Sequence, residues 1–82
     1  MDTTITYTFK TTVNIKEIGF NACKITFITR SYANKFHKLV CTSNIFRNCF
    51  SSIEENEVTF TFDVNSVKVE KHINSFAIII ED

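Results

Sequence analysis

The sequence predicts an α+β fold in a single small domain spanning residues 1–82. We expect a two-layer sandwich, in which a mostly antiparallel sheet of about five strands carries a helical segment, residues 31–53, on one face. Apolar and polar residues alternate over residues 3–15 and 58–80, which is the period of a half-buried strand. Between these stretches the apolar spacing changes to that of a helix. The predicted order is two strands, one or two helices, and three strands.

Residues 3–15 predict a long first strand with a Thr-rich outer face. Its inward positions are Ile5, Tyr7, Phe9, Val13 and Ile15. The alternation lapses at Thr11, so we expect a bulge or bend near residues 10–12. Gly19 marks the connection into a second strand, residues 22–29, whose inward positions are Cys23, Ile25 and Phe27.

Residues 31–53 show the helical period in two halves. The apolar positions are Tyr32, Phe36, Leu39 and Val40, and then Ile45, Phe46, Cys49, Phe50 and Ile53. Ser31 and Ser43 can each cap a helix start, and residues 42–44 are poor helix formers, so the pattern fits two short helices or one continuous helix. Glu54 and Glu55 would oppose the dipole at a helix C-terminus, so we expect the helix to stop near residue 53. Phe50 is expected in the core.

Residues 58–80 predict a three-stranded meander, because two Asn-Ser dipeptides at 65–66 and 74–75 are each flanked by apolar residues. With two-residue turns there, one face is apolar, with Phe62 at its centre. Lys71 interrupts that face opposite Ile78. Its charge either reaches water along its own aliphatic stem or faces a partner from within an apolar patch.

The formal net charge is zero, yet the charged residues are unevenly distributed along the chain. The positive and negative charges of the first 17 residues balance. Residues 18–53 carry five bases and no acid, and residues 54–82 carry seven acids and two bases. The five bases are Lys24, Arg30, Lys35, Lys38 and Arg47. These charges either neutralise one another in the fold or form a basic docking surface.

The sequence has no phosphate-binding loop, nucleophile elbow, Cys-x-x-Cys pair or His-Glu-x-x-His helix. His37 and Cys41, four residues apart, would lie side by side on a helix, with Cys49 as the nearest third side chain. No acid occurs between Glu17 and Glu54 to orient the histidine. We therefore expect no enzyme activity, no cofactor and no metal site.

The three cysteines are an odd number without paired spacing, which is typical of reduced thiols. No apolar run is long enough for a membrane span, and the N-terminus lacks the features of a signal peptide. We therefore expect a cytoplasmic protein without a membrane partner. The absence of Pro and the abundance of Asn, Ile, Lys and Phe are typical of an AT-rich genome, such as that of a microbe, phage or virus.

By elimination, the sequence predicts a non-enzymatic module that binds a protein partner, as an inhibitor or adaptor does. A phage or virus counter-defence inhibitor is one such binder. The alternative is single-stranded nucleic-acid binding through the basic region 24–47, where aromatic residues alternate with bases. The candidate partner-binding residues are Arg30, Tyr32, Lys35, Lys38, Arg47 and Lys71.

A homodimer is also expected, because one helix about 10–12 Å across cannot cover a five-stranded sheet roughly 20 Å wide. Residues 76–80 are apolar on both faces, so this last strand is a candidate edge for pairing with a second copy. The uncovered sheet flank near Lys71 is the other candidate.

Overall fold

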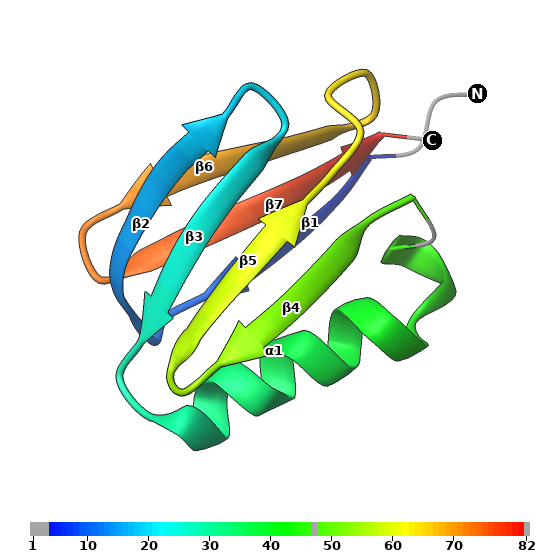
Figure 1. The fold of residues 1–82 in the computed structure, drawn as a ribbon. Helices are drawn as coiled ribbons and strands as arrows, with labels where there is room; N and C mark the ends of the chain where they lie inside the picture. Colours follow the sequence, from blue (N-terminus) through cyan, green and yellow to red (C-terminus); the bar gives the residue numbers. More distant parts are fainter. Residues whose placement is uncertain (1–3, 47, 82) are drawn as a thin grey trace.

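The computed structural model describes residues 4–46 and 48–81, which form two antiparallel sheets and one α-helix. In chain order the elements are β1 (Thr4–Phe9), β2 (Thr12–Gly19), β3 (Ala22–Phe27), α1 (Arg30–Thr42), a 3₁₀ turn η1 (Asn44–Phe46), β4 (Phe50–Glu54), β5 (Glu57–Thr61), β6 (Val67–His72) and β7 (Ser75–Glu81) (Figure 1). The predicted α+β class is confirmed.

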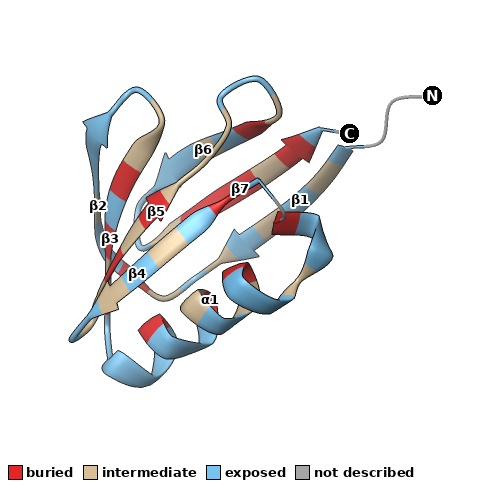
Figure 2. Ribbon diagram, turned by 45° about the vertical axis from the view of Figure 1, so that its right-hand side comes forward, coloured by how far each residue is buried: buried red, intermediate tan, exposed pale blue. Residues whose placement is uncertain are grey.

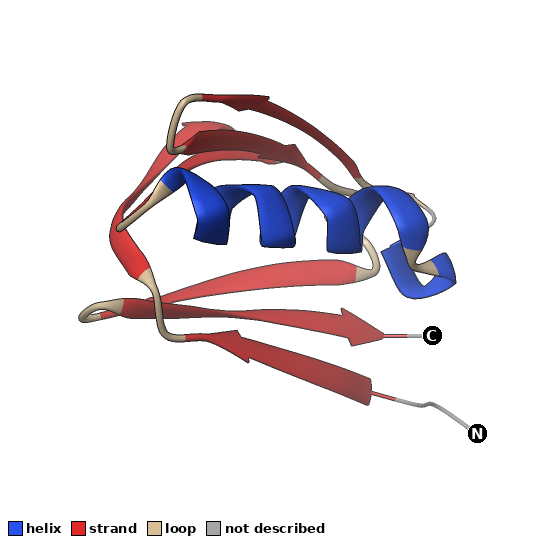
Figure 3. Ribbon diagram, turned by 90° about the horizontal axis from the view of Figure 1, so that it is seen from below, coloured by secondary structure: helices blue, strands red, loops and turns tan. Residues whose placement is uncertain are grey.

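The strands form two sheets rather than the single sheet of about five strands that the sequence predicted. The three-stranded sheet has the order β1-β7-β6, and the four-stranded sheet has the order β2-β3-β5-β4. Figure 3 shows the two sheets facing each other, with α1 lying in the opening between them. The helix therefore packs between two sheets instead of lying on one face of a single sheet.

The chain changes sheets at the bend predicted near residues 10–12. β1 ends at Phe9 in the three-stranded sheet, and β2 begins at Thr12 in the four-stranded sheet. The bend displaces the alternation by one residue, because Thr12 is buried whereas Val13, predicted to face inward, is 62 % exposed. A register shift between Thr12 and Asn14 in the β2–β3 pair then returns Ile15 to the inward side.

The first predicted hairpin of the meander is wrong. β5 pairs with β3 and β4, whereas β6 pairs with β7 in the other sheet. Ser66 and Val67 donate their backbone N–H groups to the Asp63 carbonyl at 3.1 and 2.8 Å, forming a wide turn between the sheets. The Asp63 carboxylate accepts the backbone N–H of Asn65 at 3.0 Å. Side-chain alternation could not reveal this, because residues on one face of a meander and residues facing each other across two sheets are both buried.

The second predicted hairpin is present as β6–β7, with its register shifted by two residues. The turn residues are 73 and 74, so Lys71 lies opposite Phe76 and not opposite Ile78. Asn74 has a positive φ of 61°, which Asn tolerates better than most residues do. A shift of two residues leaves the side chains within both strands on their predicted faces. Ile73, predicted to face inward opposite Phe76, instead lies in the turn and is 92 % exposed.

β7 is the central strand of its sheet, flanked by β1 and β6. The prediction that residues 76–80 form an edge for a second copy is therefore wrong. Residues buried on both faces are typical of a central strand, and here both Phe76 and Ala77 are buried.

The predicted helical segment 31–53 is α-helical only in its first half. Residues 50–54 form β4, which turns into β5 through Glu55, a residue with a positive φ of 57°. Phe50, predicted to be a core residue, is 72 % exposed. The inward positions of this segment are instead Cys49, Ser51 and Ile53, and the polar Ser51 among them concealed the period of a strand.

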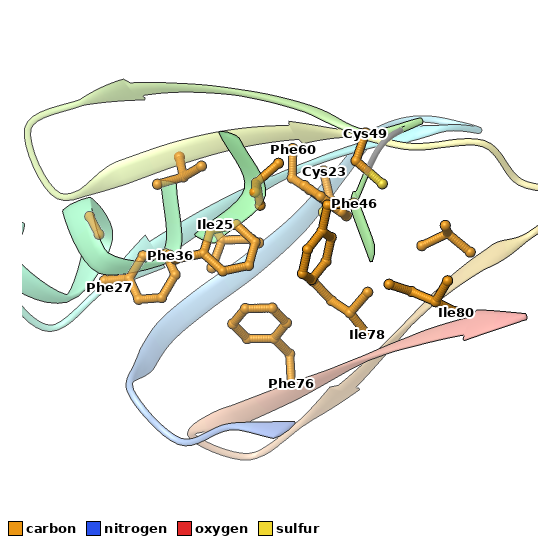
Figure 4. Close-up of a cluster of buried hydrophobic side chains, with 14 residues drawn as sticks. Cys23, Ile25, Phe27, Phe36, Phe46, Cys49, Phe60, Phe76, Ile78 and Ile80 are labelled. Atoms are coloured by element: carbon orange, nitrogen blue, oxygen red, sulfur yellow. The ribbon is translucent and has the colours of Figure 1, made fainter. Parts of the chain in front are cut away.

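Figure 2 shows buried residues on both sheets and on α1. At the centre of this core are aromatic rings contributed by both sheets and by the helix (Figure 4). Phe36 of α1 is 2 % exposed and contacts four rings at centroid distances of 5.2 to 5.6 Å. The four rings are Phe9 and Phe76 of the three-stranded sheet, and Phe27 and Phe60 of the four-stranded sheet. One helical side chain thus packs against both sheets. Phe62, the other predicted core residue, is half-buried and stacks on Phe60 at 5.4 Å.

Truncating Phe36 should destabilise the protein far more than truncating Phe50. Phe36→Ala removes a buried ring from contact with both sheets and is expected to cost about 3–5 kcal/mol of unfolding free energy. Phe50→Ala removes an exposed ring and is expected to cost less than about 1 kcal/mol. Urea unfolding monitored by circular dichroism measures both. Equal losses for the two variants would mean that residues 50–54 pack as the helical pattern suggested.

Candidate functional site: the basic face of α1

Four of the six candidate partner-binding residues lie on the exposed part of α1: Arg30, Tyr32, Lys35 and Lys38. The helix begins after Thr29, whose side-chain oxygen accepts the backbone N–H of Tyr32 at 3.2 Å. Thr29 is thus the N-cap in place of the predicted Ser31. Ala33, Phe36 and Val40 face the core. The bases are thereby presented to solvent.

The exposed bases of α1 have no acidic neighbours on their own helix, because residues 30–42 contain no Asp or Glu. Among the described residues, the ion pairs involve none of Arg30, Lys35 and Lys38. The Nζ atom of Lys35 lies 5.5 Å from the centroid of the Tyr32 ring, a cation–π contact. We call Arg30, Tyr32, Lys35 and Lys38 the basic face of α1.

The other two candidates do not join this face in the described structure. Lys71 lies on β6, with its side chain about half exposed, and its Nζ atom is 3.9 Å from a carboxylate oxygen of Glu17. Arg47 lies outside the described residues. Lys24, the remaining base of the middle region, lies on β3 with its Nζ atom 3.8 Å from Glu57.

A small polar cluster joins α1 to β4. The Nδ1 atom of His37 is 2.6 Å from the Ser51 hydroxyl oxygen, and the Cys41 sulfur is 3.9 Å from that oxygen. The sequence predicted the His37–Cys41 neighbourhood from their spacing but gave no indication of Ser51, which was assigned to a helix.

The geometry of this cluster does not build a catalytic thiol. The Cys41 sulfur is 3.9 Å from Nδ1 and 3.8 Å from Nε2 of His37, so it lies in line with neither nitrogen. No group of three or more His, Cys, Asp or Glu side chains within residues 4–46 and 48–81 is placed to hold a metal ion. The hydrogen bond between His37 and Ser51 serves instead to hold α1 beside β4.

The three cysteines differ in burial: Cys23 and Cys49 are buried and Cys41 is exposed. Burial raises the pKa of the Cys23 thiol to about 11, with a further rise from Glu17 and a partial offset from Lys71. Burial likewise raises the pKa of the Cys49 thiol to about 11, and Asp63 adds to that rise. Both buried thiols therefore stay protonated at neutral pH.

Comparison of the chain with protein-family models, with curated proteins and with solved structures finds no match. No helix in the described part of the chain has the length and apolar character needed to cross a membrane.

Alkylation of the native protein should be selective for Cys41. We expect iodoacetamide at pH 8 to modify Cys41 at least about tenfold faster than Cys23 or Cys49, because the latter two are buried and their thiolate forms are disfavoured. Peptide mapping by mass spectrometry measures the three rates, and the urea-unfolded chain, which should react at all three, is the control. Equal rates in the native protein would contradict the assigned burial.

Proposed function

We propose that this chain is a small non-enzymatic protein-binding module, acting as an inhibitor or adaptor, that docks an acidic surface of its partner through the basic face of α1. A single observation carries the proposal. The only α-helix of the described residues presents Arg30, Lys35 and Lys38 to solvent with no acid in its own sequence, although the chain as a whole is neutral. Like charges left together in this way favour an oppositely charged partner.

A protein partner is favoured over single-stranded nucleic acid because most aromatic rings of the basic region 24–47 are buried in the core. Phe27, Phe36 and Phe46 are each no more than 2 % exposed, which leaves Tyr32 as the accessible ring of that region. Nucleic-acid grooves of this kind use several stacking rings along the strand. Lys24, already paired with Glu57, also lies on a different element from the helix.

The finer parts of the proposal are a cytoplasmic location and a role as a phage or viral inhibitor of a host protein. They are supported by the short chain of 82 residues and by an amino-acid composition that is typical of an AT-rich genome. A homodimer through the flank near Lys71 belongs to the same group of proposals. At that flank Phe20 is 84 % exposed and lines a small hollow together with Lys71 and Glu17.

Charge reversal on the helix should abolish partner capture. We expect Arg30→Glu/Lys35→Glu/Lys38→Glu to lose the protein that the wild-type bait retains from nuclease-treated lysate, because the substitutions turn attraction into repulsion. The matched control is Lys10→Glu/Lys16→Glu/Lys68→Glu, which makes the same change in net charge at exposed positions outside the helix. It should retain the partner.

Quantitative mass spectrometry of the captured proteins measures the outcome. Equal capture by both variants would refute the helix as the docking face. Capture that disappears on nuclease treatment would replace the protein partner with nucleic acid.

A further inference from the structure

We propose that the segment bound by this protein is an extended acidic peptide that adds to the free edge of β4, antiparallel to it, with carboxylates on alternate residues directed at Arg30 and Lys38. This inference rests on the proposed function and specifies the chemistry and conformation of the partner. The proposed binding surface, called here the α1–β4 surface, combines Arg30, His37 and Lys38 of α1 with the outward edge of β4 at Ser51 and Ile53.

β4 is an edge strand with hydrogen-bonding groups that point away from its sheet. It pairs with β5 on one side and ends the strand order of the four-stranded sheet. At the two ends of the β3–β5 pair, the backbone N–H of Phe27 donates to the Asn56 carbonyl at 2.8 Å, and the backbone N–H of Phe62 donates to the Asn21 carbonyl at 3.0 Å. The even-numbered residues of β5 therefore form their backbone hydrogen bonds with β3. The odd-numbered residues of β5 must therefore bond toward β4.

The partners of those odd-numbered residues on β4 are residues 50, 52 and 54. The backbone N–H and C=O groups of the intervening residues, Ser51 and Ile53, consequently point outward. They offer an added strand the pairing that proteins use when a peptide extends a sheet.

The helix lies beside this edge with its basic residues on the same side. Figures 1 and 2 show α1 running alongside β4, and the 2.6 Å contact from His37 to Ser51 fixes which side of the helix faces the strand. At about 100° per residue, Arg30 lies within roughly 20° of His37 around the helix axis. Lys38 lies roughly 100° from His37, toward solvent. A strand added to β4 would thus run along Arg30 and Lys38.

The spacing of the helix matches the spacing of a strand. Arg30 and Lys38 are eight residues apart, which is about 12 Å along a helix. Residues i and i+4 of an extended peptide lie about 13 Å apart on one face. Carboxylates at two such positions can therefore meet both bases at once.

The other sheet edges fit an acidic strand less well. β6 carries Lys68, Glu70, Lys71 and His72, a mixture of signs that discourages pairing. β2 has two register shifts, and β1 has no charged residue. β4, by contrast, carries no base and one acid, Glu54, at the end of the strand that lies beside the start of α1 (Figure 1).

A hollow of about 360 Å³ adjoins this surface at the N-terminal end of β4, lined in part by Val40, Cys41, Phe50 and Ser51. A docked strand reaching this point would place one side chain in it. Because much of this lining is apolar, an apolar residue is the expected occupant.

The probe is a capped seven-residue peptide that alternates Val and Glu, titrated into the ¹⁵N-labelled protein. In an antiparallel pair, residues directly opposite each other have their side chains on the same face of the sheet. The peptide residues whose backbones bond to Ser51 and Ile53 therefore direct their side chains to the helix. In the proposed complex these residues are the glutamates. N-methylation of the Glu amides should therefore weaken binding by roughly tenfold or more. N-methylation of the Val amides, which point away from β4, should leave the affinity within about twofold.

In the parent complex we expect the amides of Ser51 and Ile53 to shift and their hydrogen exchange to slow. Arg30→Glu/Lys38→Glu should weaken binding at least roughly fivefold, whereas the control Lys16→Glu/Lys68→Glu, at exposed positions on β2 and β6, should not.

Equal affinity for both methylated peptides, with shifts confined to α1, would overturn strand addition and leave the basic face of α1 as a simple electrostatic docking site. No binding of the parent peptide to the wild-type protein would overturn the acidic strand as ligand, while partner capture dependent on Arg30, Lys35 and Lys38 would still support the proposed function. Binding of the parent peptide that Arg30→Glu/Lys38→Glu leaves unchanged would overturn the pairing of its carboxylates with Arg30 and Lys38.

Discussion

The packing of Phe36 is the contact on which the rest of the structure depends. A single ring from α1 contacts Phe9 and Phe76 of one sheet and Phe27 and Phe60 of the other, each at a centroid distance of 5.2 to 5.6 Å. A chain of 82 residues has little apolar surface to spare, and two small sheets would not bury their inner faces without a third element between them. The helix fills the opening, and its aromatic side chain provides the common core.

This packing also determines which surfaces remain available for a partner. With Ala33, Phe36 and Val40 directed inward, Arg30 and Lys38 must face outward, because they lie on other sides of the same helix. The hydrogen bond between His37 and Ser51 holds the helix against the edge strand β4, whose backbone groups at Ser51 and Ile53 point outward. The proposed docking surface is thus a consequence of how the core closes.

Sequence patterns predicted the elements whose inward positions are all apolar. The alternation at Cys23, Ile25 and Phe27 and the helical period through Phe36 and Val40 are confirmed, because each of these residues is buried. Residues 50–53 were assigned to a helix because Phe50 and Ile53 continue the apolar spacing of a helix. The strand pattern was hidden because Ser51, an inward residue, is polar and forms a hydrogen bond with a histidine 14 positions away. The division into two sheets was also missed, since alternation shows which side chains are buried but not which strand lies opposite.

The basic residues of the candidate site could be predicted from the sequence. The position of β4 as an edge strand could be known only from the folded structure.

The most direct test of this account is a set of nuclear Overhauser contacts from the Phe36 ring in a ¹³C-labelled sample. The account predicts contacts to Phe9 and Phe76 and, in the same spectrum, to Phe27 and Phe60, because the ring packs against both sheets. Contacts to the rings of one sheet alone would contradict it, since the helix would then lie on one sheet and the closure that exposes Arg30 and Lys38 beside β4 would not exist.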